Sequence, residues 1–182
     1  MLRKVVMWGM GAIIMASSVS VMAANPPELR AVRIPAAMCQ PSGSLSNVPA
    51  SLLLNDNKWV LNGDGVTTVT ATLVCPIPVS EISVNTDGAG NYIEAMKFIY
   101  KDPDAGGSNA RVQIELCSMN QFWNRSLAYF DSQTVPVSYT LNYNFPLPQT
   151  VIMKLDEYYF VRVILTKGPA FGSPEFWGIS FP

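Results

Sequence analysis

The stretch from Val66 to Pro78 constrains the fold more than any other part of the chain. Every second residue from Val69 to Cys75 is apolar, and threonines fill most of the positions between them. This period-two pattern is typical of a β-strand with one buried face. Pro76 and Pro78 have no N–H to donate to a ladder, so the strand must end there. The stretch therefore predicts a core strand that carries a buried thiol.

Similar alternation recurs along the chain at intervals of roughly ten residues, with Gly, Pro, Asn and Asp between the runs. No segment shows an apolar stripe with the 3.6-residue period of a helix. This pattern predicts an all-β fold, a single antiparallel β-sandwich, of which the jelly roll is one form. The predicted strands besides the first are Leu29–Ile34, Ser51–Leu54, Lys58–Leu61, Glu81–Val84, Tyr92–Lys101, Arg111–Met119, Val135–Phe145, Thr150–Leu155, Tyr158–Lys167 and Trp177–Phe181.

Two turn sequences predict hairpins. The turn Asn62–Gly65 would join the strand Lys58–Leu61 to the first strand, and Asp102–Gly107 would join the strands on its two sides. Tyr158–Lys167 is apolar on both sides apart from Arg162, which predicts a central strand. Residues 120–134 show no regular pattern and are expected to be irregular.

The N-terminus reads as a secretory signal peptide covering residues 1–23, so the β-sandwich domain would be residues 24–182. Arg3 and Lys4 precede an apolar run from Val5 to Val21, and small residues follow up to Ala23. An uncleaved anchor is the alternative, but this run is shorter than the roughly 20 residues that span a bilayer. We therefore expect a secreted or periplasmic protein without a membrane span in the mature chain.

Composition excludes several functions. The chain contains no histidine, which removes Ser-His-Asp and Cys-His nucleophiles, histidine general bases and His-ligated metals. The formal net charge is -1 and there is no basic run, so nucleic acid and anionic membranes are not expected partners. No motif indicates a cofactor.

Three cysteines, Cys39, Cys75 and Cys117, are candidates for a disulfide, because export permits oxidation. Their odd number leaves one thiol over. Cys75 shares the apolar face of its strand, whereas Cys117 alternates with the polar side of its own strand. This parity argues against a Cys75–Cys117 pair and leaves the partner open. The spacing needed for a metal site is missing.

The segments that surround these cysteines are Ala37-Met38-Cys39-Gln40-Pro41, Leu73-Val74-Cys75-Pro76-Ile77-Pro78 and Val112-Gln113-Ile114-Glu115-Leu116-Cys117. Together they resemble a loose group of small secreted bacterial proteins with Cys…Cys-Pro…Cys spacing. The resemblance implies export and a β fold, and it implies no particular activity.

Carboxylates give two further hypotheses. The acidic loops Asn62–Asp64, Asp87–Asn91 and Asp102–Asp104 alternate as calcium ligands do, but they lack a complete ligand set and are typical of turns. Glu94 and Glu115, on strands expected to be adjacent, could serve a carboxylate-based glycan hydrolase if they faced one cleft.

Aromatic residues give the preferred hypothesis. Trp123 lies among polar residues in the irregular segment, so it is the expected ligand contact. Trp177 alternates with Ile179 and Phe181 and is expected in the core. We thus expect a non-catalytic binding or structural module of the cell envelope or exterior, with a glycan or an envelope protein as a possible partner. The alternatives are the hydrolase and an envelope assembly subunit that pairs through a strand edge or the spare thiol.

Overall fold

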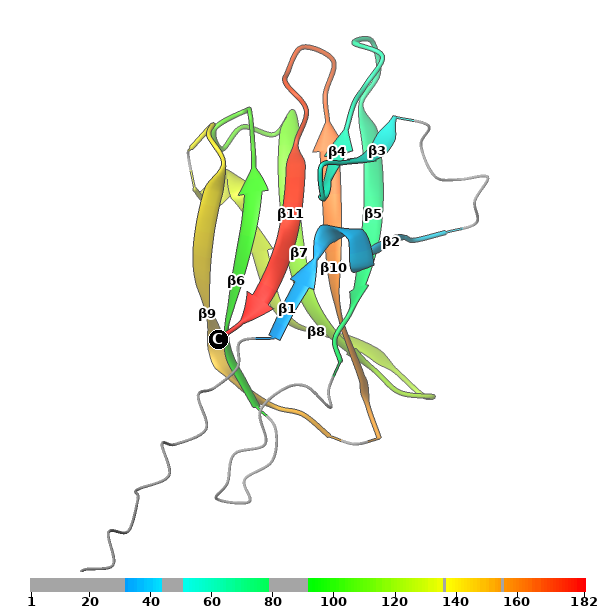
Figure 1. Ribbon diagram of the computed structural model, residues 1–182, viewed down its shortest axis with the longest axis vertical. Coiled ribbons are helices and arrows are strands. Elements are labelled where there is room, and N and C mark those ends of the chain that lie inside the picture. Colours follow the sequence, from blue (N-terminus) through cyan, green and yellow to red (C-terminus); the bar gives the residue numbers. More distant parts are fainter. Residues whose placement is uncertain (1–31, 44–50, 79–91, 136, 155) are drawn as a thin grey trace, which may run out of the picture.

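The computed structural model describes residues 32–43, 51–78, 92–135, 137–154 and 156–182. Two antiparallel sheets pack face to face, as the predicted β-sandwich requires (Figure 1). The predicted signal peptide, residues 1–23, and the predicted strand 81–84 lie outside the described residues. Within the described part of the chain, no helix has the length and apolar character needed to cross a membrane.

Sheet A has the strand order β3-β4-β11-β6-β9, with β1 paired to β11 beside β4. Sheet B has the order β2-β5-β10-β7-β8. The strands of sheet A are β1 (Val32–Pro35), β3 (Leu52–Asn55), β4 (Lys58–Leu61), β6 (Tyr92–Lys101), β9 (Leu141–Ile152) and β11 (Glu175–Phe181). Those of sheet B are β2 (Gln40–Pro41), β5 (Val69–Pro76), β7 (Ala110–Met119), β8 (Asn124–Asp131) and β10 (Tyr158–Lys167).

The strands from β4 to β11 follow the jelly-roll order. Strands β4, β11, β6 and β9 face strands β5, β10, β7 and β8, so the chain changes sheets at most connections. Both hairpins predicted from turn sequences are therefore wrong. The Asn62–Gly65 turn leads from β4 in sheet A to β5 in sheet B, and Asp102–Gly107 leads from β6 to β7. Hairpins form instead between β3 and β4 and between β7 and β8.

The first predicted strand is confirmed as β5. Ala71, Leu73 and Cys75 are buried, while the threonines between them remain at least partly accessible. The strand ends at Pro76, as the two prolines predict. Strand β10 lies between β5 and β7, which confirms its predicted central position.

Two other predictions about the chain are wrong. Residues 124–131, expected to be irregular, form the edge strand β8, which pairs with β7. The separate strands predicted at 135–145 and 150–155 are one long edge strand, β9, which begins only at Leu141. A short 3-10 turn, Ser132–Thr134, separates β8 from the approach to β9.

Aromatic side chains join the two sheets in the core. Phe130 of sheet B packs against Phe98 of sheet A with ring centroids 4.7 Å apart. Tyr100, Tyr143 and Phe145 of sheet A also contact Phe130, at 5.1 to 5.8 Å. Aromatic pairs in this range add to the free energy that burial alone provides. The inner faces of the two sheets therefore pack against each other. A ligand site is expected on an outer face of a sheet or at one end of the sandwich.

Candidate functional site

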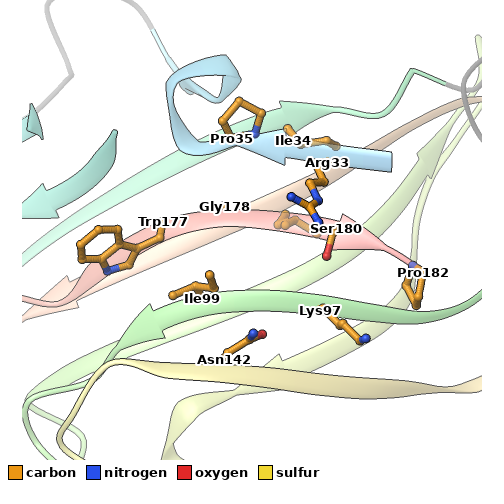
Figure 2. A pocket seen from close by; sticks show the side chains of 11 residues that line it. Arg33, Ile34, Pro35, Lys97, Ile99, Asn142, Trp177, Gly178, Ser180 and Pro182 are labelled. Carbon is orange, nitrogen blue, oxygen red and sulfur yellow. The ribbon is translucent and has the colours of Figure 1, made fainter. Parts of the chain in front are cut away.

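A hollow of about 630 Å³ lies on the outer face of sheet A (Figure 2). It crosses strands β1, β11, β6 and β9, so four strands far apart in sequence contribute to it. Its size falls within the range of pockets that bind small molecules. The residues that line it are Arg33, Ile34, Pro35, Lys97, Ile99, Asn142, Trp177, Gly178, Ile179, Ser180 and Pro182.

A β-bulge in β11 creates the hollow. The pairing of β11 with β6 shifts between Phe176 and Gly178, so one extra residue enters β11 at this point. Phe176 and Ile179 therefore both face the core, while Trp177 turns outward. The prediction that Trp177 is a core residue is wrong, because the bulge reverses its parity with Ile179.

Gly178 is required at the centre of the bulge. Its φ of 141° lies in a region that residues with a side chain rarely adopt. A Cβ at this position would lie 2.7 Å from the Ile34 backbone oxygen, so β1 could not pair so closely. The glycine thus allows β1 to join the sheet and leaves an open floor between Pro35 and Ile99, its register partners.

Polar side chains form a row beside this floor. Arg33 of β1 pairs in register with Ser180 of β11, and Ser180 pairs with Lys97 of β6. Lys97 is in turn opposite Asn144 of β9. Side chains directly opposite each other on neighbouring strands lie within contact range. The row therefore places a guanidinium, a hydroxyl and an ammonium group side by side on one surface.

Trp177 forms one end of the hollow, away from this row (Figure 2). Lys58 Nζ lies 4.5 Å from the centroid of its ring and also pairs with Glu175 at 2.7 Å. The indole Nε1 is buried and has no hydrogen-bond partner among the described residues. A buried indole N–H normally finds an acceptor, so this unpaired donor makes Trp177 unusual among the described residues.

The cysteine prediction left the pairing open, and the structure pairs Cys39 with Cys75. Cys117 is free but buried, and burial raises the pKa of its thiol to about 12. Only a thiolate attacks a disulfide, and a thiol with so high a pKa stays protonated at neutral pH. Cys117 in the folded protein is therefore unreactive, and because it is buried another chain cannot reach it. The proposed assembly through the spare thiol is not supported by this placement.

Trp123, the expected ligand contact, lies in the tip of the β7–β8 hairpin and is half-buried. The Arg125 guanidinium lies 4.7 Å from the centroid of its ring. Trp123 lies in the loop that joins two strands of sheet B, and it is not among the residues that line the hollow on sheet A. Neighbouring Phe122 is strongly exposed, so the hairpin tip is accessible. The structure does not bring Trp123 together with any other expected site residue.

The carboxylates proposed for hydrolysis are separated. Glu94 lies on β6 in sheet A, whereas Glu115 lies on β7 in sheet B and pairs with Arg162 at 2.9 Å. They were expected on adjacent strands, and that expectation is wrong because β6 and β7 belong to opposite sheets. Among the described residues that line the hollow, none is Asp or Glu.

The acidic loops behave as turns. Both oxygens of Asp64 accept hydrogen bonds from Val66 and Thr67, while Asp104 accepts from the N–H groups of Asn109 and Ala110. In the described part of the chain, no group of three or more potential ligands from Cys, Asp or Glu could hold a metal ion. The loop 87–91 lies outside the described residues.

Asp102 is fully buried at the end of β6 and is the most unusual of these acids. Its carboxylate accepts from the Ser132 hydroxyl at 2.5 Å and from the Asp104 N–H at 3.0 Å. Burial nevertheless raises its pKa above 3.8, and it also raises the pKa of Tyr100 nearby. A carboxyl whose pKa is raised by folding binds its proton more tightly in the native state.

We expect Asp102→Asn to change how stability depends on pH. As pH rises from 3.8 through the raised pKa, the wild-type protein loses stability relative to this variant, by up to about 1.4 kcal/mol per pH unit. Urea unfolding of both proteins between pH 4 and pH 8 measures the difference. Asp64→Asn should show the opposite sign, because hydrogen bonds from Thr67 and Val66 lower the pKa of Asp64. A pH-independent difference for Asp102→Asn would contradict this account.

No family model matches the chain, and no curated protein matches it. Solved structures that resemble it include the family 32 carbohydrate-binding module from C. perfringens NanJ in complex with galactose. That module is 14% identical with a TM-score of 0.33, and the match covers 81% of this chain and 98% of the module.

A second similar structure is the arabinose-bound MgGH51 α-L-arabinofuranosidase, 10% identical with a TM-score of 0.35. The match covers 83% of this chain but only 24% of that enzyme. At these TM-scores, neither resemblance assigns a ligand or an activity to this chain.

Sequence reasoning missed Arg33, Lys97 and Trp177. The two basic residues occupy exposed positions of their strands, where surface cations are common. The available signal was Gly178, because a glycine inside a strand often marks a bulge. A bulge there would have placed Trp177 and Ile179 on opposite faces.

Proposed function

We propose that the protein is an exported, non-catalytic binding module whose ligand site is the hollow on sheet A. The observation that carries this proposal is the composition of the hollow. An aromatic wall and an apolar floor meet a row of three hydrogen-bonding side chains, which is the usual composition of a small-molecule site.

A saccharide fits this composition best. A sugar ring has an apolar C–H face, which can pack against Trp177 and Ile99, and hydroxyl groups at its rim. Ser180 and Asn142 can donate to those hydroxyls and accept from them, because each carries both kinds of group. No Asp or Glu is among the described lining residues, so they supply no acid–base pair of the kind glycoside hydrolysis needs. Binding without cleavage is therefore the function that these residues support.

Export is supported by the Cys39–Cys75 disulfide, since such bonds persist in oxidising compartments. The predicted signal peptide at residues 1–23 agrees with it. The proposed location is the periplasm or the exterior of the cell.

Binding of the purified exported protein to a saccharide array tests this function. We expect at least one ligand to bind, and Trp177→Ala to weaken that binding by about tenfold or more, because the aromatic wall is lost. Trp123→Ala is the matched control and should bind as the wild type does. If Trp123→Ala loses binding while Trp177→Ala retains it, the site lies at the β7–β8 hairpin and the hollow is not the ligand site.

A further inference from the structure

Most basic side chains of the described residues are paired with a carboxylate. Six of the nine basic residues in this part of the chain lie within 4.0 Å of a carboxylate: Lys58, Lys101, Arg111, Arg125, Lys154 and Arg162. A seventh, Lys167, is buried and donates to the backbone oxygens of Gly168 and Phe171. The two that remain are Arg33 and Lys97. Both are exposed, and both line the hollow.

These two cations flank a single hydroxyl. Arg33 and Lys97 are the register partners of Ser180 on its two sides, so their Cα atoms lie two strand spacings apart, about 10 Å. Figure 2 shows the Arg33 guanidinium beside Ser180, with Lys97 on the neighbouring strand. Long, flexible side chains at this separation can converge on one group placed above Ser180.

An oxyanion is the group that such a row would bind. Arginine donates two parallel hydrogen bonds to a carboxylate or sulfate, lysine adds a point charge, and the serine hydroxyl donates a third contact. No Asp or Glu side chain is among the described lining residues, and neither cation lies within 4.0 Å of a carboxylate in the described part of the chain. We propose that the ligand is an acidic saccharide, and that Arg33, Ser180 and Lys97 bind its carboxylate or sulfate group.

The distance along β11 from the row of Arg33, Ser180 and Lys97 to Trp177 indicates where the sugar ring of the ligand would lie relative to its acid group. Ser180 lies two residues along β11 from Gly178, or about 7 Å. An acid group bound over Ser180 would therefore leave the attached sugar ring above Gly178 and Ile99, with Trp177 beyond it (Figure 2). This inference rests on the proposed function, since it assigns the charge of the ligand at the same site.

A saccharide array that carries each backbone as the neutral sugar, the C6-carboxylate and the C6-sulfate tests the inference. We expect an acidic form to bind the exported protein at least tenfold more tightly than its neutral counterpart. Arg33→Gln and Lys97→Gln should each weaken binding of the acidic form by about 10- to 100-fold and weaken binding of the neutral form much less, so that the preference for the acidic form falls. Raising sodium chloride from about 0.05 M to about 0.5 M should weaken binding several-fold.

Lys101→Gln is the matched control. Lys101 lies on the same strand as Lys97, but it pairs with Glu175 and does not line the hollow. Its loss should not change the affinity for any acidic form. The carboxylate and sulfate probes show which acid the row prefers.

The outcomes separate this inference from the proposed function. Binding that depends on Trp177 but is equal for neutral and acidic forms would overturn the acidic ligand and leave the binding module standing. Binding to none of the three forms on any backbone would overturn both.

Discussion

Replacing both Cys39 and Cys75 by alanine should lower the free energy of unfolding by about 4 kcal/mol. The disulfide joins residues separated by 36 positions, and a loop of this length gives about that value when its closure entropy is removed from the unfolded chain. The bond also has a structural role, because it ties the segment after β1 to β5 in the opposite sheet. Urea unfolding of the oxidised protein and of the double variant measures the loss.

The same variant should lose affinity for acidic ligands even where it remains folded. Cys39 follows β1 by only a few residues, and β1 carries Arg33. Without the disulfide, this segment is still held by its pairing with β11 and β5, by burial of Ile34 and Ala36 in the core, and by hydrogen bonds such as that from Trp59 Nε1 to the Ala36 oxygen, at 2.8 Å. Removing the crosslink leaves the segment freer to fray from its ends. Fraying of β1 would displace the guanidinium while leaving Trp177 in place.

Cys117→Ala is the control for the loss of a cysteine side chain as such. Cys117 is free and buried, so its replacement removes a small volume but no crosslink. We expect a cost of about 1 kcal/mol. If the Cys39/Cys75 double variant is no less stable than this control, the disulfide does not stabilise the fold.

The amino-acid pattern predicted which faces are buried but not which strands pair. Alternation along β5 identified its buried side correctly. Strand β10 was expected to be covered on both sides; it is central, but only one of its sides is fully buried. Alternation carries no information about partners, because a strand with one buried face fits either sheet. The turn at Asn62–Gly65 suits a tight hairpin locally, yet the jelly roll uses it to cross between the sheets. Pairing of β4 with β11 joins residues more than 100 positions apart, so no local signal could predict it.

Strand β8 was missed for a related reason. It is an edge strand, and only Ala128 and Phe130 of its residues are buried. The rest of the segment is polar because it faces solvent, and its alternation is too short to be recognised. Trp123 was chosen as the expected ligand contact because residues 120–134 looked irregular; Trp123 itself does lie in the loop between β7 and β8, immediately before β8 begins at Asn124.

The candidate site depends even more on tertiary structure. Arg33 and Lys97 differ from other surface cations only in lacking a carboxylate nearby, and that property appears only once the sheets are assembled. Cys39 and Cys75 could be proposed as disulfide candidates from the predicted export alone. Their pairing could not be predicted, because it depends on where the segment after β1 crosses from sheet A to sheet B.

Gly178→Ala should be the most damaging substitution in the site, since it combines two costs. The φ of 141° is unfavourable for any residue with a Cβ, and strain of this kind costs about 1–3 kcal/mol. The added Cβ would also meet the Ile34 oxygen at 2.7 Å, and this neighbour is backbone that can move only if β1 leaves the sheet. We expect a loss of about 3 kcal/mol or more in the free energy of unfolding.

Gly65→Ala separates the two costs. Gly65 also has a positive φ, 78°, but a Cβ there would find its nearest neighbour at 4.0 Å, so only the backbone strain remains. This control should cost about 1 kcal/mol and leave ligand affinity unchanged. Urea unfolding and binding to the saccharide array measure both variants. Equal losses in the free energy of unfolding for the two variants would mean that the close packing of β1 against Gly178 adds no stability. The position of Arg33 beside Ser180 would then not depend on this packing.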